Sequence, residues 1–300
     1  MNLTALNQKF GIGEQIIFST GEGGLPVAII RNQYATAIIS LYGAHVLSYI
    51  PSGEKELLWM STKSLFKEGK AIRGGIPLCF PWFGKHLTDP SLPQHGFARL
   101  SMWEVAETAT MGNGASQISL QLHQSADTKA LWPYAFSAIV TVTVGETLEL
   151  KLKVLNTDEE DFTYSDALHT YLNISNINNT SIEGFYKTPY YDGFGDTPTV
   201  QQDKVLTIAK EENRRYVEHS ADCIVTDNGY NRKIRVSKTG SKVTVVWNPW
   251  IETTKTMGDM AADGYQTFVC VEAANSYDDV VTLKPFEEFT ITTTIALEQS

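Results

Sequence analysis

Hydrophobic and polar residues alternate along much of the chain with a period of two. In the stretch Thr147–Val154 (TLELKLKV), leucine or valine takes every second position, with glutamate or lysine between them. The stretches Gln117–Leu122, Lys242–Trp247 and Glu288–Leu297 repeat this alternation. A period of two puts successive side chains on opposite faces of a strand, so each stretch predicts a strand buried on one face. Strands of this kind are typical of antiparallel sheets.

Turn signals separate the predicted strands at short intervals, as at Gly112–Gly114 and Asn228–Gly229. Helical patterns are weak: Ser125–Trp132 fits two turns of helix and Ser61–Glu68 fits one. There is no strand–helix–strand alternation, no linker rich in proline or serine, and no internal repeat. The pattern therefore predicts an all-β protein, a single domain over residues 1–300 folded as one large antiparallel β-sandwich.

Composition and charge narrow the classes of partner. The formal charge of −10 and a pI near 5.1 argue against nucleic acid and against an anionic membrane surface. No apolar run approaches the ~20 residues of a membrane span, and the first residues lack the pattern of a secretory signal. Cys79, Cys223 and Cys270 are far apart and unpaired in spacing, so we expect reduced thiols in a cytoplasmic protein.

Two segments break the strand rhythm and concentrate unusual residues: Arg73–Lys85 (RGGIPLCFPWFGK) and Leu92–Arg99 (LPQHGFAR). Their glycines permit positive φ and close backbone approach. They carry the polar side chains of Arg73, Gln94, His95 and Arg99 and the aromatic rings of Phe80, Trp82, Phe83 and Phe97. Aromatic faces with a few polar groups are suited to a sugar ring, and arginine forks match phosphate or carboxylate oxygens. Ordinary packed loops with surface arginines have the same composition, so both interpretations stay open here.

Two single residues stand out in the later strands. His169 lies in ALHTY (Ala167–Tyr171), where a strand would put its side chain on the same face as those of the two end residues. In FVCVEAANS (Phe268–Ser276), the alternating valines predict the core face and leave Cys270 and Glu272 on the other. An acid that ends an apolar run must be solvated, paired or functional. Taken alone, each residue is more often structural than catalytic.

Several common chemistries have no signature in the sequence. No GxSxG, GxGxxG or P-loop pattern occurs. No group of histidine, cysteine and carboxylate residues has the spacing of metal ligands, and His123 and His219 are predicted to lie on the surface. We therefore expect neither a metal nor a nucleotide cofactor.

Six motifs carry a family resemblance: RGGIP, LPQHGFAR, ALHTY, WNPW, MGDM and FVCVE follow in this order between residues 73 and 272. With them the sequence resembles the glucose-6-phosphate 1-epimerases, the hexose-6-phosphate mutarotases of the aldose 1-epimerase superfamily. The earlier segment GAHVLSY…ELLWMS is also similar. The resemblance implies a galactose mutarotase-like supersandwich with its active site on a concave sheet face. This agrees with the period-two alternation.

The resemblance also implies roles for particular residues. His169 and Glu272 match the catalytic histidine and glutamate of the family. Arg73 and Arg99 match arginines that the family associates with the substrate phosphate. Gln94 matches a substrate-binding position, and His95 matches a pocket histidine of the superfamily. Asn213 stands where many relatives carry the aspartate of a Thr-Asp-Arg motif; asparagine keeps an acceptor and gains donors but loses the charge.

The implied reaction is the interconversion of the α and β anomers of a hexose 6-phosphate, with glucose 6-phosphate as the first choice. The ring opens when the O1 proton is removed and ring O5 is protonated, and it recloses after rotation about C1–C2. We expect Glu272 as the base and His169 as the acid of ring opening, on opposite sides of the ring, without a cofactor. In a protein of charge −10, capture of an anionic substrate should depend on the local Arg73 and Arg99.

Other functions remain as alternatives. An aldose 1-epimerase for unphosphorylated sugars is disfavoured by the two loop arginines. A non-catalytic carbohydrate-binding or sensing protein would not need both an acid and a base. A glycoside hydrolase would need two carboxylates. We expect a small-molecule sugar phosphate as the partner, no nucleic acid or membrane, and a monomer or weak dimer.

Overall fold

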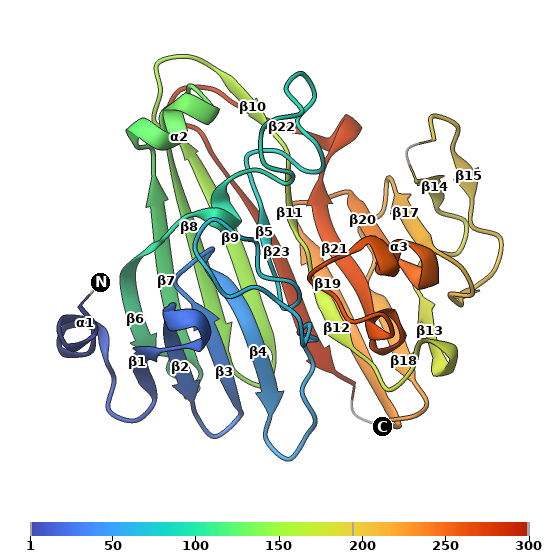
Figure 1. Ribbon diagram of the computed structural model, residues 1–300, viewed down its shortest axis with the longest axis horizontal. Coiled ribbons are helices and arrows are strands. Elements are labelled where there is room, and N and C mark those ends of the chain that lie inside the picture. Colours follow the sequence, from blue (N-terminus) through green and yellow to red (C-terminus); the bar gives the residue numbers. More distant parts are fainter. Residues whose placement is uncertain (1, 194, 299–300) are drawn as a thin grey trace.

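The fold is built from antiparallel sheets, the largest of nine strands. The computed structural model describes residues 2–193 and 195–298. The large sheet has the order β16-β13-β18-β19-β23-β9-β8-β7-β6 (Figure 1). Its strands are β6 (Glu104–Thr110), β7 (Ser116–His123), β8 (Phe136–Val144), β9 (Leu148–Asn156), β13 (Thr180–Glu183), β16 (Val205–Leu206), β18 (Cys223–Asp227), β19 (Arg232–Thr239) and β23 (Glu288–Leu297). In β8 and β9 every second residue is buried, which confirms the predicted alternation.

An eight-stranded sheet carries the residues that the sequence singled out. Its order is β15-β14-β17-β20-β21-β11-β5, and β12 also pairs with β21. The strands are β5 (Leu78–Cys79), β11 (Asp166–Leu168), β12 (Tyr171–Asn173), β14 (Pro189–Asp192), β15 (Thr199–Val200), β17 (Glu212–Tyr216), β20 (Val243–Asn248) and β21 (Phe268–Asn275). Strand β21 is buried at every position, because one face packs on the core while the other packs in two smaller hydrophobic clusters and lines a pocket at Glu272.

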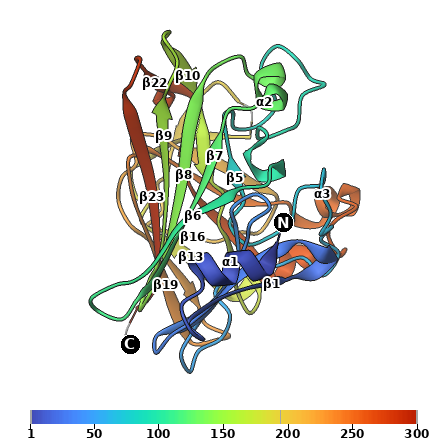
Figure 2. The ribbon, with the colours of Figure 1, turned by 90° about the vertical axis from the view of Figure 1, so that its left-hand side faces the viewer.

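Smaller elements complete the fold. They are the four-stranded sheet β1 (Ile16–Thr20), β2 (Pro26–Arg31), β3 (Ala35–Ser40) and β4 (His45–Pro51), the pair β10 (Phe162–Tyr164) and β22 (Val281–Leu283), the helices α1 (Leu3–Phe10), α2 (Ala126–Leu131) and α3 (Trp250–Thr256), and 3-10 turns at Glu22–Gly24, Ala98–Leu100, Ile177–Asn179, Gly264–Thr267 and Tyr277–Asp279. Figure 2 shows the long strands β8, β9 and β23 on one side of the molecule and α3 on the other. None of the described helices is long and apolar enough to cross a membrane.

The helix predictions were partly right. Helix α2 lies within the predicted segment, and Ser125 caps it through the reciprocal hydrogen bonds of a capping box with Thr128. The helical turn predicted at Ser61–Glu68 was wrong, since that segment forms hydrogen-bonded turns. The surface position predicted for His219 was also wrong. Its ring is buried, with Nδ1 2.9 Å from the Thr244 hydroxyl.

Candidate active site

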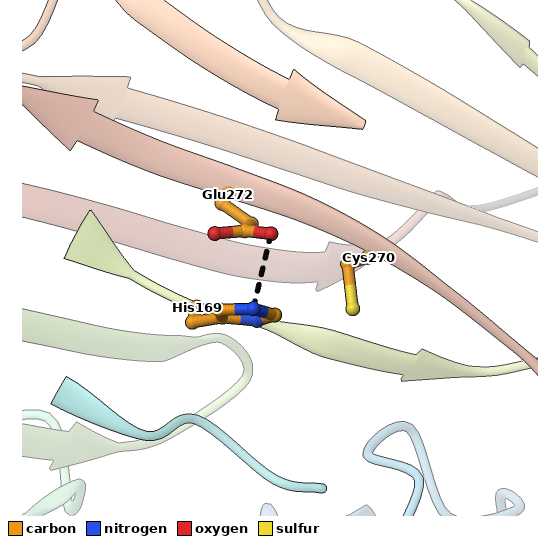
Figure 3. A group of neighbouring side chains, drawn as sticks. All are labelled: His169, Cys270 and Glu272. Carbon is orange, nitrogen blue, oxygen red and sulfur yellow. Dashed lines mark ion pairs between the residues drawn. The ribbon is translucent and has the colours of Figure 1, made fainter. Parts of the chain in front are cut away.

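The backbone places His169 and Glu272 on one wall of a pocket. Glu272 lies within β21, on the opposite face from the core-facing valines, as predicted. The continuous strand predicted through ALHTY is wrong at His169, because β11 ends at Leu168 and β12 begins at Tyr171. In this break the His169 N–H donates to the Pro77 carbonyl. The imidazole faces the Glu272 carboxyl (Figure 3).

The two side chains are in direct contact. His169 Nε2 lies 3.4 Å from Glu272 Oε1. The residues are 7% and 1% exposed, and within the described residues His169 Nδ1 and Glu272 Oε2 have no hydrogen-bond partner. We expected the pair on opposite sides of a sugar ring, but the observed contact puts them side by side.

Burial controls the protonation of this pair. It raises the pKa of Glu272 well above its usual range, because an ionised carboxylate loses hydration there. It lowers the pKa of His169 to about 3, and the charges of Arg73 and Arg99 act in the same direction. Both shifts favour the neutral forms in the free protein, a protonated carboxyl on Glu272 and an unprotonated imidazole on His169. Ring opening as expected above needs the opposite state, with an ionised Glu272 and a protonated His169. Transfer of one proton from Glu272 to His169 across the contact converts the first state into the second.

The segment that contains Gln94 and His95 folds over β5. Gly96 has a φ of 73°, and a Cβ there would lie 2.0 Å from the Phe80 carbonyl oxygen, so only glycine allows this approach. His95 Nδ1 accepts a hydrogen bond from the Gly84 N–H at 3.0 Å, which leaves Nε2 as the N–H donor. Nε2 lies 3.3 Å from the Gln94 side-chain amide. Burial lowers the pKa of His95, so its ring stays neutral.

The two predicted arginines differ in how their charges are compensated. Arg73 Nη2 lies 3.0 Å from Asp259 Oδ2, and its Nη1 donates to the Tyr171 hydroxyl. Arg99 Nη2 donates to the Gln94 backbone carbonyl at 2.7 Å. Its Nε is buried without a partner, and in the described part of the chain no carboxylate forms an ion pair with it. Of these two arginines, Arg99 is therefore the one whose charge is available to an anionic ligand.

A pocket of about 250 Å³ brings the predicted residues together. Its lining includes all six of them, namely Arg73, Gln94, His95, Arg99, His169 and Glu272. Sequence reasoning gave no role to other lining residues: Arg215, Val245, Trp247, Met257 and Tyr277. Of these, Trp247 and Met257 lie in the WNPW and MGDM motifs, which were the only signal for them. Asn213 also lines the pocket, which agrees with its inferred motif position.

The aromatic residues of the two loops were largely misread. Phe80, Trp82 and Phe97 belong to the hydrophobic core, and only Phe83 of the four reaches the pocket. The aromatic wall comes instead from Trp247 of β20, whose ring centroid lies 5.9 Å from that of His169.

Three potential metal ligands meet at the pair: donor atoms of His169, Cys270 and Glu272 lie within 4.8 Å of one another (Figure 3). Linear spacing missed this group because the histidine comes from a different segment. A thiol and a carboxyl must both lose protons to bind a metal. Burial raises the pKa of Cys270 and of Glu272, which makes loss of both protons to a divalent ion less favourable.

Asp166, three residues before His169, provides a test of buried charge. Burial raises the pKa of its carboxyl to about 8 from 3.8. Between these values the native state holds a proton that the unfolded chain has released, so stability falls as pH rises. Asp166→Asn removes this loss. The free energy of unfolding of Asp166→Asn should exceed that of wild type at both pH values. This difference should be about 3 kcal/mol larger at pH 8 than at pH 5.5, since one pKa unit is about 1.4 kcal/mol. Urea unfolding at both pH values measures it, and a pH-independent difference would contradict the assignment.

Comparison with known proteins agrees with the fold and the pocket. The aldose 1-epimerase family model matches residues 26–296, and the chain belongs to this family. It is therefore an epimerase, an isomerase that interconverts sugar anomers.

The relatives refine this class. A candidate glucose-6-phosphate 1-epimerase of Escherichia coli K12 is 36% identical over 83% of this chain and 83% of its own. A candidate glucose-6-phosphate 1-epimerase of Cenchrus ciliaris is 33% identical over 89% and 83%. The crystal structure of a candidate mutarotase from Salmonella typhimurium superposes with a TM-score of 0.89 at 30% identity, covering 97% of this chain and 96% of that one. The predicted supersandwich fold is thus confirmed.

Proposed function

We propose that the protein interconverts the α and β anomers of hexose 6-phosphates, and of glucose 6-phosphate in particular. The observation that carries this proposal is a contacting pair, His169 and Glu272, in a pocket that also holds the uncompensated cation of Arg99. The names of the relatives from Escherichia coli and Cenchrus ciliaris support the same substrate.

The proposed chemistry uses the one proton of the pair. Sugar O1 and O5 are bonded to the same carbon, so two adjacent protein groups can reach both. Ring opening begins with the proton on His169: Glu272 removes the O1 proton, His169 protonates O5, and the C1–O5 bond breaks to leave an aldehyde. After rotation about C1–C2, O5 attacks the other face of C1. His169 then takes the O5 proton and Glu272 returns one to O1.

Phosphate binding assists this proton transfer. We assign the phosphate to Arg99, with Arg73 as a second cation, and sugar hydroxyls to Gln94 and the His95 Nε2–H. Arg73 and Arg99 lower the pKa of His169 in the free protein. A bound phosphate offsets both charges, so it raises the pKa of His169 and favours the protonated imidazole that ring opening requires.

One observation favours the alternative of an unphosphorylated aldose: the charge of Arg73 is already compensated by Asp259. Anomer exchange measured by NMR separates the two functions, with glucose 6-phosphate and glucose compared side by side at equal enzyme concentration. We expect faster catalysed exchange for the phosphate. Equal rates would favour the free-aldose function, and absence of exchange with both sugars would favour a binding protein.

Exhaustive chelation should leave the exchange rate unchanged. The acid–base route needs no Lewis acid, and the protonated Cys270 and Glu272 disfavour metal binding. The measurement compares glucose 6-phosphate exchange before and after dialysis against EDTA. Loss of activity that one divalent ion restores would contradict the cofactor-free mechanism.

We further propose a cytoplasmic enzyme that works as a monomer or weak dimer. The three cysteines are buried and free, which fits a reducing compartment.

A further inference from the structure

A third arginine of the pocket, Arg215, lies away from the two that sequence reasoning selected. It is on β17, and the register of the sheet aligns Tyr191, Arg215, Val245 and Glu272 in one row across four strands. Strand β17 is two strands from β21, about 10 Å across the sheet at the usual spacing. Like Val245 and Glu272, Arg215 lines the pocket.

The guanidinium of Arg215 is buried without a counter-charge. The residue is 5% exposed, and no carboxylate in the described residues forms an ion pair with it. Among the described residues its Nε has no partner, and its one hydrogen bond there, from Nη2 to the Gly195 carbonyl, is long at 3.4 Å. The guanidinium is held by aromatic faces instead, 3.7 Å from the ring centroid of Tyr277 and 5.5 Å from that of Tyr191.

The neighbouring Arg214 shows what a structural arginine looks like on this strand. Its side chain pairs with Glu212 at 2.9 Å and donates to the Gln201 side chain at 2.8 Å. Burying a charge without such partners is unfavourable unless a ligand supplies them. Stacking on two tyrosines fixes the direction of the Arg215 guanidinium and leaves its N–H donors free for that ligand.

The acid–base pair, His169 and Glu272, has arginines on two sides. Arg215 lies on one side, and Arg73 and Arg99 lie on the other. The segment that carries Arg99 lies beside the end of β5: the N–H of Phe80, the residue after this strand, donates to the His95 carbonyl. Arg73 bonds to Tyr171 of β12. Strands β5, β11 and β12 all lie on the opposite side of β21 from β20 and β17. The pocket therefore has one cationic region on each side of Glu272.

We propose that Arg215 binds a second anionic group of the ligand, so that the pocket accepts reducing sugars with an anionic group on each side of the anomeric centre. This inference rests on the proposed function for the position of the sugar. In the furanose ring of a 1,6-bisphosphorylated ketohexose, one phosphate is attached beside the anomeric carbon and the other beside ring O5. The reacting oxygens then lie between two phosphates, as the acid–base pair lies between two cationic regions. Asn213, beside Arg215 on the strand, adds hydrogen-bond donors without a negative charge.

Calorimetric titration with fructose 1,6-bisphosphate and fructose 6-phosphate tests this proposal. Wild type should bind the bisphosphate at least about tenfold more tightly, since a charge-assisted hydrogen bond is worth about 10- to 100-fold in affinity. Arg215→Gln should abolish this preference and leave fructose 6-phosphate affinity within about threefold. Arg215→Lys should retain part of it. Arg31→Gln, which removes an exposed arginine, is the matched control for net charge and should change neither affinity.

Two outcomes would overturn the proposal. One is a wild type without preference for the bisphosphate. The other is an equal loss of both ligands in Arg215→Gln with an unchanged melting temperature, which would assign Arg215 to a single shared phosphate. If Arg215→Gln does not fold, the test uses Arg215→Lys. A ligand-binding role predicts that this variant keeps only part of the bisphosphate preference, whereas a merely structural charge would leave the preference intact. Binding is measured separately from turnover, so failed glucose 6-phosphate exchange would contradict the proposed function without deciding the role of Arg215.

Discussion

Glu272→Gln should lower kcat for glucose 6-phosphate exchange by about 10²- to 10⁴-fold, the usual contribution of general acid–base catalysis. The amide keeps the shape of the carboxyl and can neither accept nor release the proton that passes between O1 and O5. KM should change little, because Arg99 and the aromatic wall remain. NMR exchange rates at saturating substrate measure the effect, after subtraction of the uncatalysed exchange.

His169→Asn should have an effect of similar size, because the single proton of the pair needs both groups. The double variant should then lose little more than either single one. Cys270→Ser, a change on the same face of β21, serves as the control and should keep most of the activity. Near-normal exchange in either single variant would remove that residue from the catalytic assignment.

Arg99→Gln should lower kcat/KM for glucose 6-phosphate about 10- to 100-fold and leave glucose almost unaffected. The reason is that Arg99 has a buried Nε without a partner, and no carboxylate in the described residues compensates its charge. Rising salt should reduce the preference of wild type for the phosphate. The quantity to compare is the ratio of kcat/KM for the two sugars, before and after substitution.

Arg73→Gln should have a smaller effect on the same ratio, because Asp259 already offsets the charge of Arg73. The variant also leaves Asp259 without its partner, so Arg73→Gln combined with Asp259→Asn is the cleaner comparison. If Arg99→Gln weakens both sugars equally, Arg99 is structural and the phosphate assignment fails with it.

The strands were predictable because their side chains obey a local rule. The alternation in Thr147–Val154 appears directly in β9, where every second residue is buried. The strands predicted at Glu288–Leu297 and Lys242–Trp247 are also present, as β23 and β20, but the prediction of one buried face was wrong there, because consecutive residues of both strands are buried. Glu272 was assigned the correct face of its strand by the same local rule. The six residues predicted for the site do meet in one pocket, but motifs far apart in the sequence carried that prediction rather than periodicity.

The remaining features depend on contacts between distant segments, which periodicity does not record. The break at His169 arises where its N–H bonds to Pro77. Nothing local distinguishes Phe83, which reaches the pocket, from Phe80, which is buried in the core. Arg214 and Arg215 are adjacent and chemically identical, and only the two faces of β17 separate a compensated arginine from an uncompensated one.

Strand β21 is enclosed on both sides, and alternate residues along it face opposite sides of the sheet. Val269 and Val271 contact the core, so substitutions there act on the fraction of molecules that are folded. Glu272, one position further along, faces the pocket, and under the proposed mechanism a substitution there acts on turnover in molecules that are folded. Neighbours in sequence thus answer to different selective pressures. Loss of function in this strand has two separable origins, of which only the first can be compensated by stabilising changes elsewhere in the protein.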